Sequence, residues 1–288
     1  MVDRKIARTR PMRYRDGAFL AREDHLAGEE PLEMRIGGRQ FSVTMRTPGH
    51  DIELVHGFLH GEGIITDRAD IAAVRYCDGV DEQGRNTYNV LDVTLAEGVA
   101  APAADRARQV TTTSACGVCG SASIDVIRQR SRFALTGPTP MDPAVVAGLP
   151  DTLRLQQRVF ERTGGTHGAA LADPAGALTL VREDVGRHNA VDKVIGAALV
   201  DGLLGTDRSL GSHALVTSSR ASFELVQKAA VAGIGMLVAV SAPSSLAVEL
   251  ATDVGMTLIG FVRNGGFNIY SGAERIGGTA PRPARLAH

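Results

Sequence analysis

Long apolar stretches are missing from this chain of 288 residues. The longest apolar run, Ile234 to Val240, is far too short to span a bilayer. The start of the chain carries Arg4, Lys5, Arg8 and Arg10 but no apolar stretch behind them, which does not match a targeting signal. We therefore expect a cytoplasmic protein that is not attached to a membrane.

An excess of charge of either sign is also missing. The 31 Lys and Arg residues nearly balance 32 Asp and Glu residues, which gives a formal net charge of -1. Such a chain has no bulk attraction to nucleic acid, so any anion site has to be local. Lysine occurs only as Lys5, Lys193 and Lys228, and arginine supplies the other cations. Arginine offers planar, bidentate phosphate recognition, although genomic codon bias explains its abundance equally well.

Cysteine is scarce, and three cysteines cannot form a secreted disulfide framework in a chain of this length. Cys116 and Cys119 lie in the glycine-rich segment Ser114 to Ser121, where the backbone can turn tightly and present both sulfurs on one side. Ser121 can cap a following helix, whose exposed amides favour the thiolate form of Cys119. A thiolate accepts sulfane sulfur as a persulfide, which a second thiol can relay or resolve into a disulfide. The pair is our candidate for the catalytic groups.

Three other uses of the cysteine pair stay open. A structural zinc site needs four ligands, and Cys77 is the one further cysteine in the chain. A thioredoxin-like redox pair would follow the first strand of a compact βαβ unit. Zinc deaminases carry P-C-x-x-C, whereas Ala115 precedes Cys116 here. His56 and His60 share a helix face but lack the HExxH glutamate, so we interpret them as surface or packing residues and expect no metal.

The patterning predicts two unequal domains after a loose basic arm over residues 1–20. Residues 21–104 read as a small α+β domain, with a hairpin around Gly37-Gly38, a helix over 51–59 and strands over 71–76 and 88–95. Residues 105–288 hold the cysteine loop and a larger α/β domain. Its expected helices cover 150–162, 190–203, 223–232 and 246–254, and its expected strands 167–172, 178–182, 214–217, 236–240 and 258–262. Such alternation predicts parallel strands covered by helices.

Polar turns follow three of these strands, at the edge where open α/β sheets bind ligands. They are Ser218 to Ser222, which includes Ser219 and Arg220, then Ser241 to Ser245, and Arg263 to Gly266. Hydroxyls, helix-start amides and arginines suit phosphates. Helix capping by the serines explains each turn singly, but their recurrence at one edge favours an anion site. Neither GxGxxG nor GxxxxGK[ST] occurs, so a standard dinucleotide fold or P-loop is disfavoured.

A dense polar run, Arg182 to Asn189, separates a predicted strand from a buried helix. We expect part of this run, with Arg187 as the candidate, to face a ligand or partner. A salt-bridged loop capped by Asn189 is the alternative. His167, in a glycine-rich turn, is similarly placed, or is an ordinary turn residue.

Several segments, taken together and in this order, are specific for one family. They are Glu30 to Arg35, Met45 to Gly49, Gly57 to Leu59, Gly61 to Gly63, Cys116 to Gly120, Arg182 to Asn189, Val191 to Lys193, Ser218 to Arg220 and Phe261 to Tyr270. On these segments the chain resembles FdhD, the family of formate dehydrogenase accessory sulfurtransferases. The helix with His50, His56 and His60 departs from the family pattern.

The resemblance implies that Cys116 carries a persulfide received from a cysteine desulfurase, with Cys119 assisting the relay. The sulfur would pass to molybdenum in bis-molybdopterin guanine dinucleotide, on its way to formate dehydrogenase. The family's cofactor-binding stretch maps onto Phe261, Val262, Arg263, Asn264, Gly265 and Gly266, at one of the three polar turns, and GDP or GMP would occupy the same site.

The resemblance also implies a homodimer. It implies a cytidine-deaminase-like three-layer α/β/α main domain without the zinc ligands, beside the smaller N-terminal α+β domain. The alternative function is a zinc- or redox-dependent CxxC module that binds a nucleotide.

Overall fold

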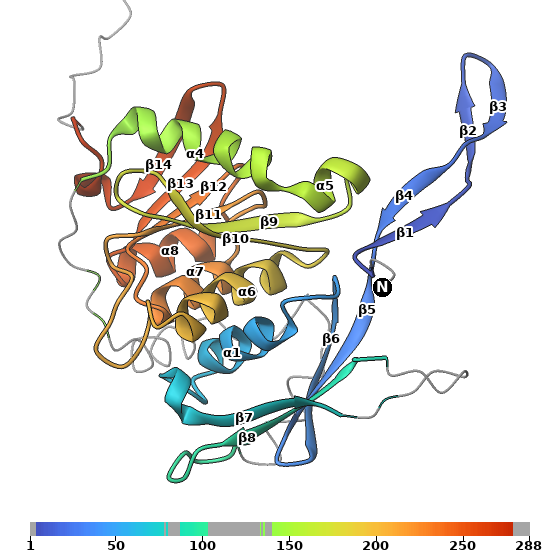
Figure 1. The fold of residues 1–288 in the computed structure, drawn as a ribbon. Helices are drawn as coiled ribbons and strands as arrows, with labels where there is room; N and C mark the ends of the chain where they lie inside the picture. The colour runs from blue at the N-terminus through green and yellow to red at the C-terminus, as the bar shows by residue number, and fades with distance from the viewer. Residues whose placement is uncertain are drawn as a thin grey trace, which may run out of the picture.

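The N-terminal end of the chain forms a narrow ribbon that projects from the rest of the molecule (Figure 1). The computed structural model describes residues 4–77, 79, 87–102, 133, 135 and 140–278. The ribbon contains β1 (Ile6–Thr9), β2 (Met12–Arg15), β3 (Ala18–Ala21) and β4 (Asp24–Ala27). β1 pairs with β4 and β2 pairs with β3, in both cases antiparallel.

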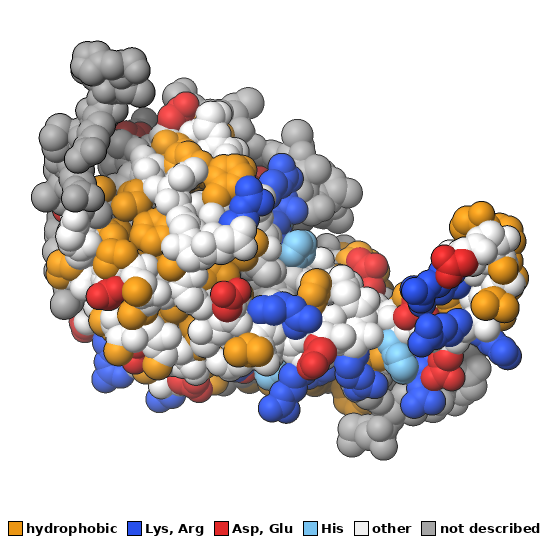
Figure 2. Space-filling view, turned by 90° about the horizontal axis from the view of Figure 1, so that it is seen from above, with side chains coloured by type: hydrophobic (Ala, Val, Ile, Leu, Met, Phe, Trp, Pro, Cys, Tyr) orange, Lys and Arg blue, Asp and Glu red, His pale blue; other side chains and the backbone are white. Residues whose placement is uncertain are grey.

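The ribbon differs from the loose arm that the sequence predicts for residues 1–20. Every residue from Arg10 to Asp24 is exposed, so the apolar periodicity on which strand prediction depends is absent. Backbone pairing forms these strands instead. Tyr14 and Phe19 lie across from each other at the tip with ring centroids 5.0 Å apart, and Figure 2 shows apolar side chains at the tip beside basic ones nearer the body. The domain boundaries stay predictions.

A four-stranded sheet in the order β6-β5-β8-β7 forms the next unit. Its strands are β5 (Glu30–Ile36), β6 (Arg39–Arg46), β7 (Ile71–Tyr76) and β8 (Val90–Leu95), and the short 3-10 helix η1 (Arg68–Asp70) precedes β7. The predicted hairpin is confirmed, and its turn residues Gly37 and Gly38 have φ values of 58° and 79°, which glycine adopts without strain. The predicted helix is α1 (Asp51–Gly61), whose Leu54, Val55 and Leu59 are buried.

The main sheet has six strands in the order β10-β9-β11-β12-β13-β14. They are β9 (His167–Ala172), β10 (Leu178–Asp184), β11 (Ala214–Thr217), β12 (Met236–Ala239), β13 (Thr257–Arg263) and β14 (Gly266–Ser271). β11, β12 and β13 are parallel, with Val216 opposite Val238 and Val238 opposite Ile259. The remaining pairings are antiparallel. The prediction of parallel strands is therefore confirmed for the centre of the sheet.

Helices cover both faces of this sheet (Figure 1). α4 (Pro143–Gln156) packs on one face and α6 (Arg187–Val200), α7 (Phe223–Val231) and α8 (Ser245–Asp253) pack on the other, because successive strand residues feed two separate apolar clusters. The short α5 (Arg158–Thr163) follows α4, and the 3-10 helix η2 (Ala273–Arg275) follows β14. The mixed α/β class is confirmed. Within the described ranges, each helix is too short or too polar to cross a membrane.

One helix was predicted with the wrong bounds, and one strand was missed. The helix expected over 150–162 begins at Pro143, where Asp142 accepts a hydrogen bond from the amide of Ala144 at 2.7 Å and so caps the helix. Pro150, taken as a helix start, lies inside α4. β14 was not predicted, because none of its residues is fully buried and its sequence therefore gives no apolar run.

The four-stranded sheet and α1 form a small unit, which packs on the main domain where α1 crosses α6. Two positions at this crossing, Gly57 on α1 and Gly196 on α6, are glycines and carry no side chain. A Cβ atom added at Gly57 would lie 1.9 Å from the carbonyl oxygen of Asp192, and one at Gly196 would lie 1.7 Å from the carbonyl oxygen of Glu53. No atom fits at such distances, so each glycine permits direct backbone contact between the helices. The crossing fixes where the end of β10 and the start of α6 sit relative to the small unit.

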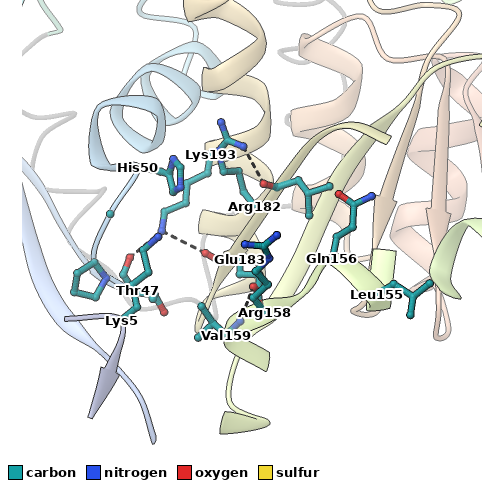
Figure 3. Close-up of a pocket in the computed structure, with 13 residues that line it drawn as sticks. Lys5, Thr47, His50, Leu155, Gln156, Arg158, Val159, Arg182, Glu183 and Lys193 are labelled. Atoms are coloured by element: carbon teal, nitrogen blue, oxygen red, sulfur yellow. Dashed lines mark hydrogen bonds between the residues drawn. The ribbon is translucent and has the colours of Figure 1, made fainter. Parts of the chain in front are cut away.

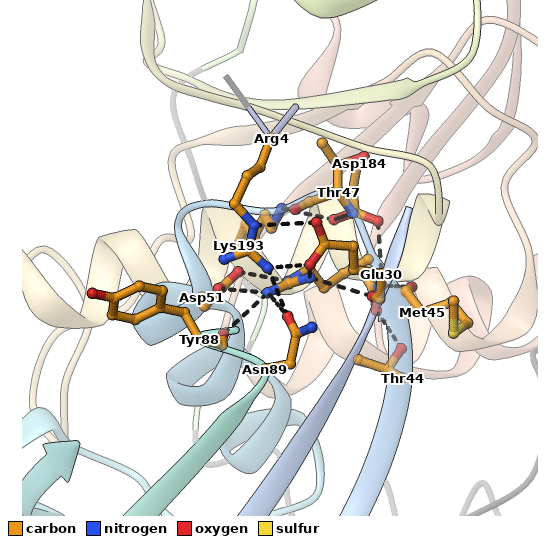
Figure 4. A network of polar contacts seen from close by, with 12 residues as sticks. Arg4, Glu30, Thr44, Met45, Thr47, Asp51, Tyr88, Asn89, Asp184 and Lys193 are labelled. Carbon is orange, nitrogen blue, oxygen red and sulfur yellow. Dashed lines mark hydrogen bonds and ion pairs between the residues drawn. The ribbon is translucent and has the colours of Figure 1, made fainter. Parts of the chain in front are cut away.

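Buried ion pairs lie next to this crossing (Figure 4). Arg46 is fully buried and donates from Nε and Nη2 to the two carboxylate oxygens of Asp51, each at 3.0 Å, and from Nη2 to Asn89 at 3.0 Å. Lys193 of α6 pairs with Asp184 at the end of β10, with Nζ 2.7 Å from Oδ2. Charges this deeply buried are tolerated because each has a partner of opposite sign with good geometry.

We expect Gly196→Ala to lower the free energy of unfolding by about 3 kcal/mol, because the added methyl group overpacks a backbone contact. Urea denaturation measures the change. Gly148→Ala is the matched control, since a Cβ at this helical glycine of α4 meets nothing within 4 Å. The control should be neutral or raise stability by up to about 1 kcal/mol through helix propensity. Equal effects of the two substitutions would contradict close packing of α1 on α6.

Glu53 on α1 joins the two units through Arg182 on β10, whose Nε and Nη2 donate to its carboxylate at 2.5 and 2.8 Å. Burial alone would raise the pKa of Glu53, but hydrogen bonds from Arg182 and His50 lower it from 4.5 to about 2. The folded-state pKa lies below the unfolded one. The pair therefore stabilises fully above about pH 4.5 and loses its contribution as the pH falls toward 2.

We expect Glu53→Gln to destabilise the protein at pH 7 by roughly 1–2 kcal/mol, allowing for partial solvent screening. The difference from wild type should shrink as the pH is lowered from 5 to 3 in urea denaturation series. Glu97→Gln, at an exposed turn after β8, should show no such pH-dependent difference. If the difference in unfolding free energy between Glu53→Gln and wild type stays constant with pH, the carboxylate charge does not stabilise the contact between α1 and β10.

Candidate functional site

The three polar turns meet at one edge of the main sheet, where β11, β12 and β13 end. The amide of Ser244 donates to the carbonyl of Ala221 at 3.0 Å, which links the turns after β11 and β12. The amide of Phe261 donates to the carbonyl of Ser241 at 3.2 Å, which links the turn after β12 to β13. The structure therefore brings together the segments that the sequence placed at this edge.

The serine hydroxyls of these turns hold the backbone in place. Ser219 is 5% exposed, and its Oγ lies 2.9 Å from Thr217 Oγ1 and 3.0 Å from the carbonyl oxygen of Arg220. Ser218 Oγ accepts from the amide of Gly168 at 2.9 Å, and Ser244 Oγ accepts from an amide of α8 at 3.3 Å. These hydroxyls therefore serve in helix capping and turn hydrogen bonds, which was the alternative to ligand binding in the sequence analysis. Ser219 shapes the turn that presents the exposed side chain of Arg220.

Cationic side chains of α6 reach the same edge. Arg187 is the first residue of α6, and its buried Nε has no hydrogen-bond partner within the described parts of the chain. Burial lowers the pKa of His167, and the nearby charges of Arg187 and His188 lower it further. His167 is therefore neutral at pH 7 and leaves Arg187 as the charged donor. A buried guanidinium N–H without an acceptor fits an oxyanion, which would accept its hydrogen bond.

The stretch Phe261 to Gly266 forms the end of β13 and the turn into β14. Phe261 has a φ of 54° and Asn264 a φ of 53°, both in the left-handed region. This conformation is strained for a bulky aromatic residue and is commonest where a structure holds a ligand or a turn. The guanidinium of Arg263 lies 5.6 Å from the ring centroid of Phe261 and is exposed to solvent. The end of β13 and the turn into β14 thus present a cation and an aromatic ring at the sheet edge.

Cys116 and Cys119 lie outside the described residues, so their place relative to this edge stays a prediction. Of the histidines on α1, His56 is 7% exposed and its Nδ1 lies 2.8 Å from the carbonyl oxygen of Ile52, with its pKa lowered by burial. His60 is also buried. Among the residues that the structure describes, no cluster of three or more His, Cys, Asp or Glu side chains is arranged to hold a metal ion.

Two features near this edge have no counterpart among the sequence-based predictions. His188 Nε2 lies 3.5 Å from Ser222 Oγ and 3.8 Å from a carboxylate oxygen of Glu224, which joins the starts of α6 and α7. A cavity of about 310 Å³ also opens beside the end of β10 (Figure 3). Its lining comes from stretches far apart in the chain, and no sequence pattern relates such stretches.

Fold and site together define a mixed α/β protein with a polar, arginine-bearing edge at the ends of its parallel strands. A family model described as the FdhD/NarQ family matches residues 27–277, and the chain belongs to this family. The resemblance noted in the sequence is thereby confirmed.

Relatives match along almost their whole length. A protein of Streptomyces coelicolor named sulfur carrier protein FdhD is 51% identical, over 96% of this chain and 97% of the relative. Proteins with the same name from Nocardia farcinica and Mycobacterium tuberculosis are both 53% identical, over 96% and 89% of this chain and 96% and 93% of their own lengths.

A solved structure shares the fold. The crystal structure of a candidate formate dehydrogenase accessory protein from Desulfotalea psychrophila has a TM-score of 0.72, with coverage of 94% of this chain and 99% of that one. At 24% sequence identity this similarity supports the fold alone.

Proposed function

We propose that this protein is a sulfurtransferase that loads Cys116 with sulfane sulfur from a cysteine desulfurase and delivers it to a guanine-dinucleotide molybdenum cofactor. The cofactor, bis-molybdopterin guanine dinucleotide, is the substrate and is bound at the sheet edge before it enters formate dehydrogenase. Support comes from membership of the FdhD/NarQ family and from relatives named as sulfur carriers. The observation that carries the cofactor site is the buried, unpartnered Nε of Arg187 among three polar turns.

The proposed chemistry needs two thiols. The Cys116 thiolate attacks the outer sulfur of the desulfurase persulfide, so a new S–S bond forms on Cys116 and the desulfurase cysteine leaves as a thiolate. For delivery, the Cys119 thiolate attacks the inner sulfur of the Cys116 persulfide. A Cys116–Cys119 disulfide forms and hydrosulfide leaves as the molybdenum ligand. Reduction of the disulfide by a cellular dithiol would return both cysteines to the thiol state.

Binding of the cofactor uses the edge residues described above. Arg187, Arg220 and Arg263 supply cations for the phosphates, and Phe261 supplies a ring on which a guanine base can stack. Phe261, Val262, Arg263, Asn264, Gly265 and Gly266 form the stretch that the family resemblance assigns to the cofactor, and Ser219 shapes the neighbouring turn. The proposal includes a homodimer, a cytoplasmic location and a cytidine-deaminase-like main domain.

We expect incubation with a cysteine desulfurase and cysteine to add one reducible sulfur atom to Cys116, because its thiolate is the proposed acceptor. Intact-mass and peptide mass spectrometry measure the addition. Cys116→Ser should abolish it, and Cys77→Ser, at a half-buried cysteine after β7, is the matched control and should retain it. Stoichiometric zinc with no persulfide would instead favour the metal-binding module, and a reversible disulfide alone would favour the redox module.

We expect GMP and GDP to bind at the sheet edge. Arg263→Ala should lower the affinity for GDP by about tenfold, because one charge-assisted contact is lost. Isothermal titration calorimetry measures both affinities. Arg208→Ala is the matched control, since this exposed arginine lies in the loop after α6 and outside the edge. An unchanged GDP affinity in Arg263→Ala would remove the Phe261–Gly266 turn from the site.

A further inference from the structure

Exposed apolar side chains gather on the ribbon formed by β1 to β4 (Figure 2). Five large ones, between 49% and 67% exposed, are Met12, Tyr14, Phe19, Leu20 and Leu26. Soluble proteins scatter such side chains singly, so a group of this size marks a surface that another molecule covers. A two-stranded ribbon is also only marginally stable by itself in water. The ribbon therefore needs a partner on which to pack.

The outer hairpin of the ribbon has one face without charge. β2 pairs with β3 so that Tyr14 lies opposite Phe19 and Met12 lies opposite Ala21. Opposed residues, and residues two apart along a strand, share a face, so these four side chains lie together. The arginines of β2 are on the opposite face. An apolar face backed by cations suits a protein surface that is apolar at its centre and acidic at its rim.

The base of the ribbon is fastened to the small unit. Arg4 donates from Nε to Glu30 at 3.1 Å and from Nη2 to Asn89 at 3.0 Å. The amide of Gly28 donates to the carbonyl oxygen of Lys5 at 2.7 Å, and a Cβ at Gly28 would lie 2.1 Å from the carbonyl oxygen of Arg4. The ribbon is thus held at its base and projects away from the rest of its own chain (Figure 1).

Charge is divided unequally between the ribbon and the rest of the chain, which we call the body. Residues 4–27 carry seven cations and three anions, a formal charge of +4. The body carries 24 cations and 29 anions, a formal charge of -5. Two ribbons packed face to face would bring like charges together, whereas a ribbon packed on the body of another copy joins opposite charges. Charge therefore favours a ribbon seated on the body of a second copy.

We propose that each ribbon docks on the body of a second copy of this chain, so that two copies exchange ribbons. Five large side chains at about 60% exposure offer roughly 500 Å² per ribbon. Counting the surface that they cover, two exchanged ribbons bury roughly 2,000 Å², the size of a stable interface. One ribbon on an unrelated protein would bury about half as much, at the lower limit for a specific contact. The exchange also closes with two-fold symmetry, the commonest symmetry of oligomers.

The proposed function includes a homodimer and assigns no surface to it. The family model begins at residue 27, where the ribbon ends, so family membership does not supply the contact. The ribbon contact rests on this homodimer and adds to it the element through which each copy holds the other.

Two other occupants fit the ribbon less well. A bilayer would have to admit Asp16 at the tip turn, whose side chain is 91% exposed, and a carboxylate in hydrocarbon is costly. Single-stranded nucleic acid binds through free aromatic faces and cations. Tyr14 and Phe19 instead pack against each other, and three carboxylates lie among the arginines of the ribbon. A protein surface is therefore the better match.

Sedimentation equilibrium of the full chain, at physiological ionic strength, measures the dissociation constant of the dimer. Tyr14→Ser with Phe19→Ser should raise this constant by at least about a hundredfold, because each contact loses two aromatic anchors. Circular dichroism checks that the fold is intact, as expected for side chains exposed in one copy. Val200→Ser with Leu203→Ser, at the exposed end of α6, is the matched control and should leave the constant unchanged. Equal weakening by both double variants overturns the proposal.

Cross-linking locates the seat of the ribbon. Irradiation of Phe19→p-benzoylphenylalanine should give a covalent dimer in which the cross-linked peptide belongs to the body of the other copy. A cross-link between two ribbons overturns the exchange. So does binding of a monomer to phosphatidylglycerol vesicles or single-stranded RNA that is lost in Tyr14→Ser with Phe19→Ser. A monomeric wild type overturns the homodimer as well, whereas a dimer that survives the ribbon variant overturns the ribbon contact alone.

Discussion

Direct backbone contact between α1 and α6 is the constraint on which the arrangement of this protein depends. Gly57 and Gly196 leave no room for a Cβ at the crossing, so the two helices approach as closely as their main chains allow. Arg187 and His188 lie at the start of α6, and His50 precedes the first residue of α1. The crossing therefore sets the distance between the small unit and the sheet edge.

Buried cationic side chains in this protein are paired with carboxylates, and Arg187 is an exception among the described residues. Arg46 and Lys193 are buried with carboxylate partners, and such pairs contribute a fixed geometry more than net stability. Arg187 departs from this pattern, because its buried Nε finds no acceptor within the described residues. At the sheet edge an anionic ligand would thus complete the hydrogen bonding of a buried guanidinium.

Much of the fold followed from the sequence because its signals are local. Alternating apolar runs and helical stretches predicted β11 to β13 and α6 to α8 within a few residues, and Gly37-Gly38 predicted the first hairpin. The ribbon was missed because none of its strand residues is fully buried and those of β2 and β3 are all exposed. At the site, the sequence placed Ser219 at the right edge but could not show that its hydroxyl turns inward to Thr217. The glycine crossing and the cavity could not be predicted, since they join stretches that are distant in the chain.

The proposed function requires that sulfur held on Cys116 reaches a cofactor bound at the sheet edge. The most direct measurement follows radiolabelled sulfane sulfur from the persulfidated protein to bis-molybdopterin guanine dinucleotide in a single turnover, with and without excess GMP. We expect label on the cofactor and a slower transfer when GMP competes for the edge. Label that stays on the protein, or transfer at a rate indifferent to GMP, would contradict it.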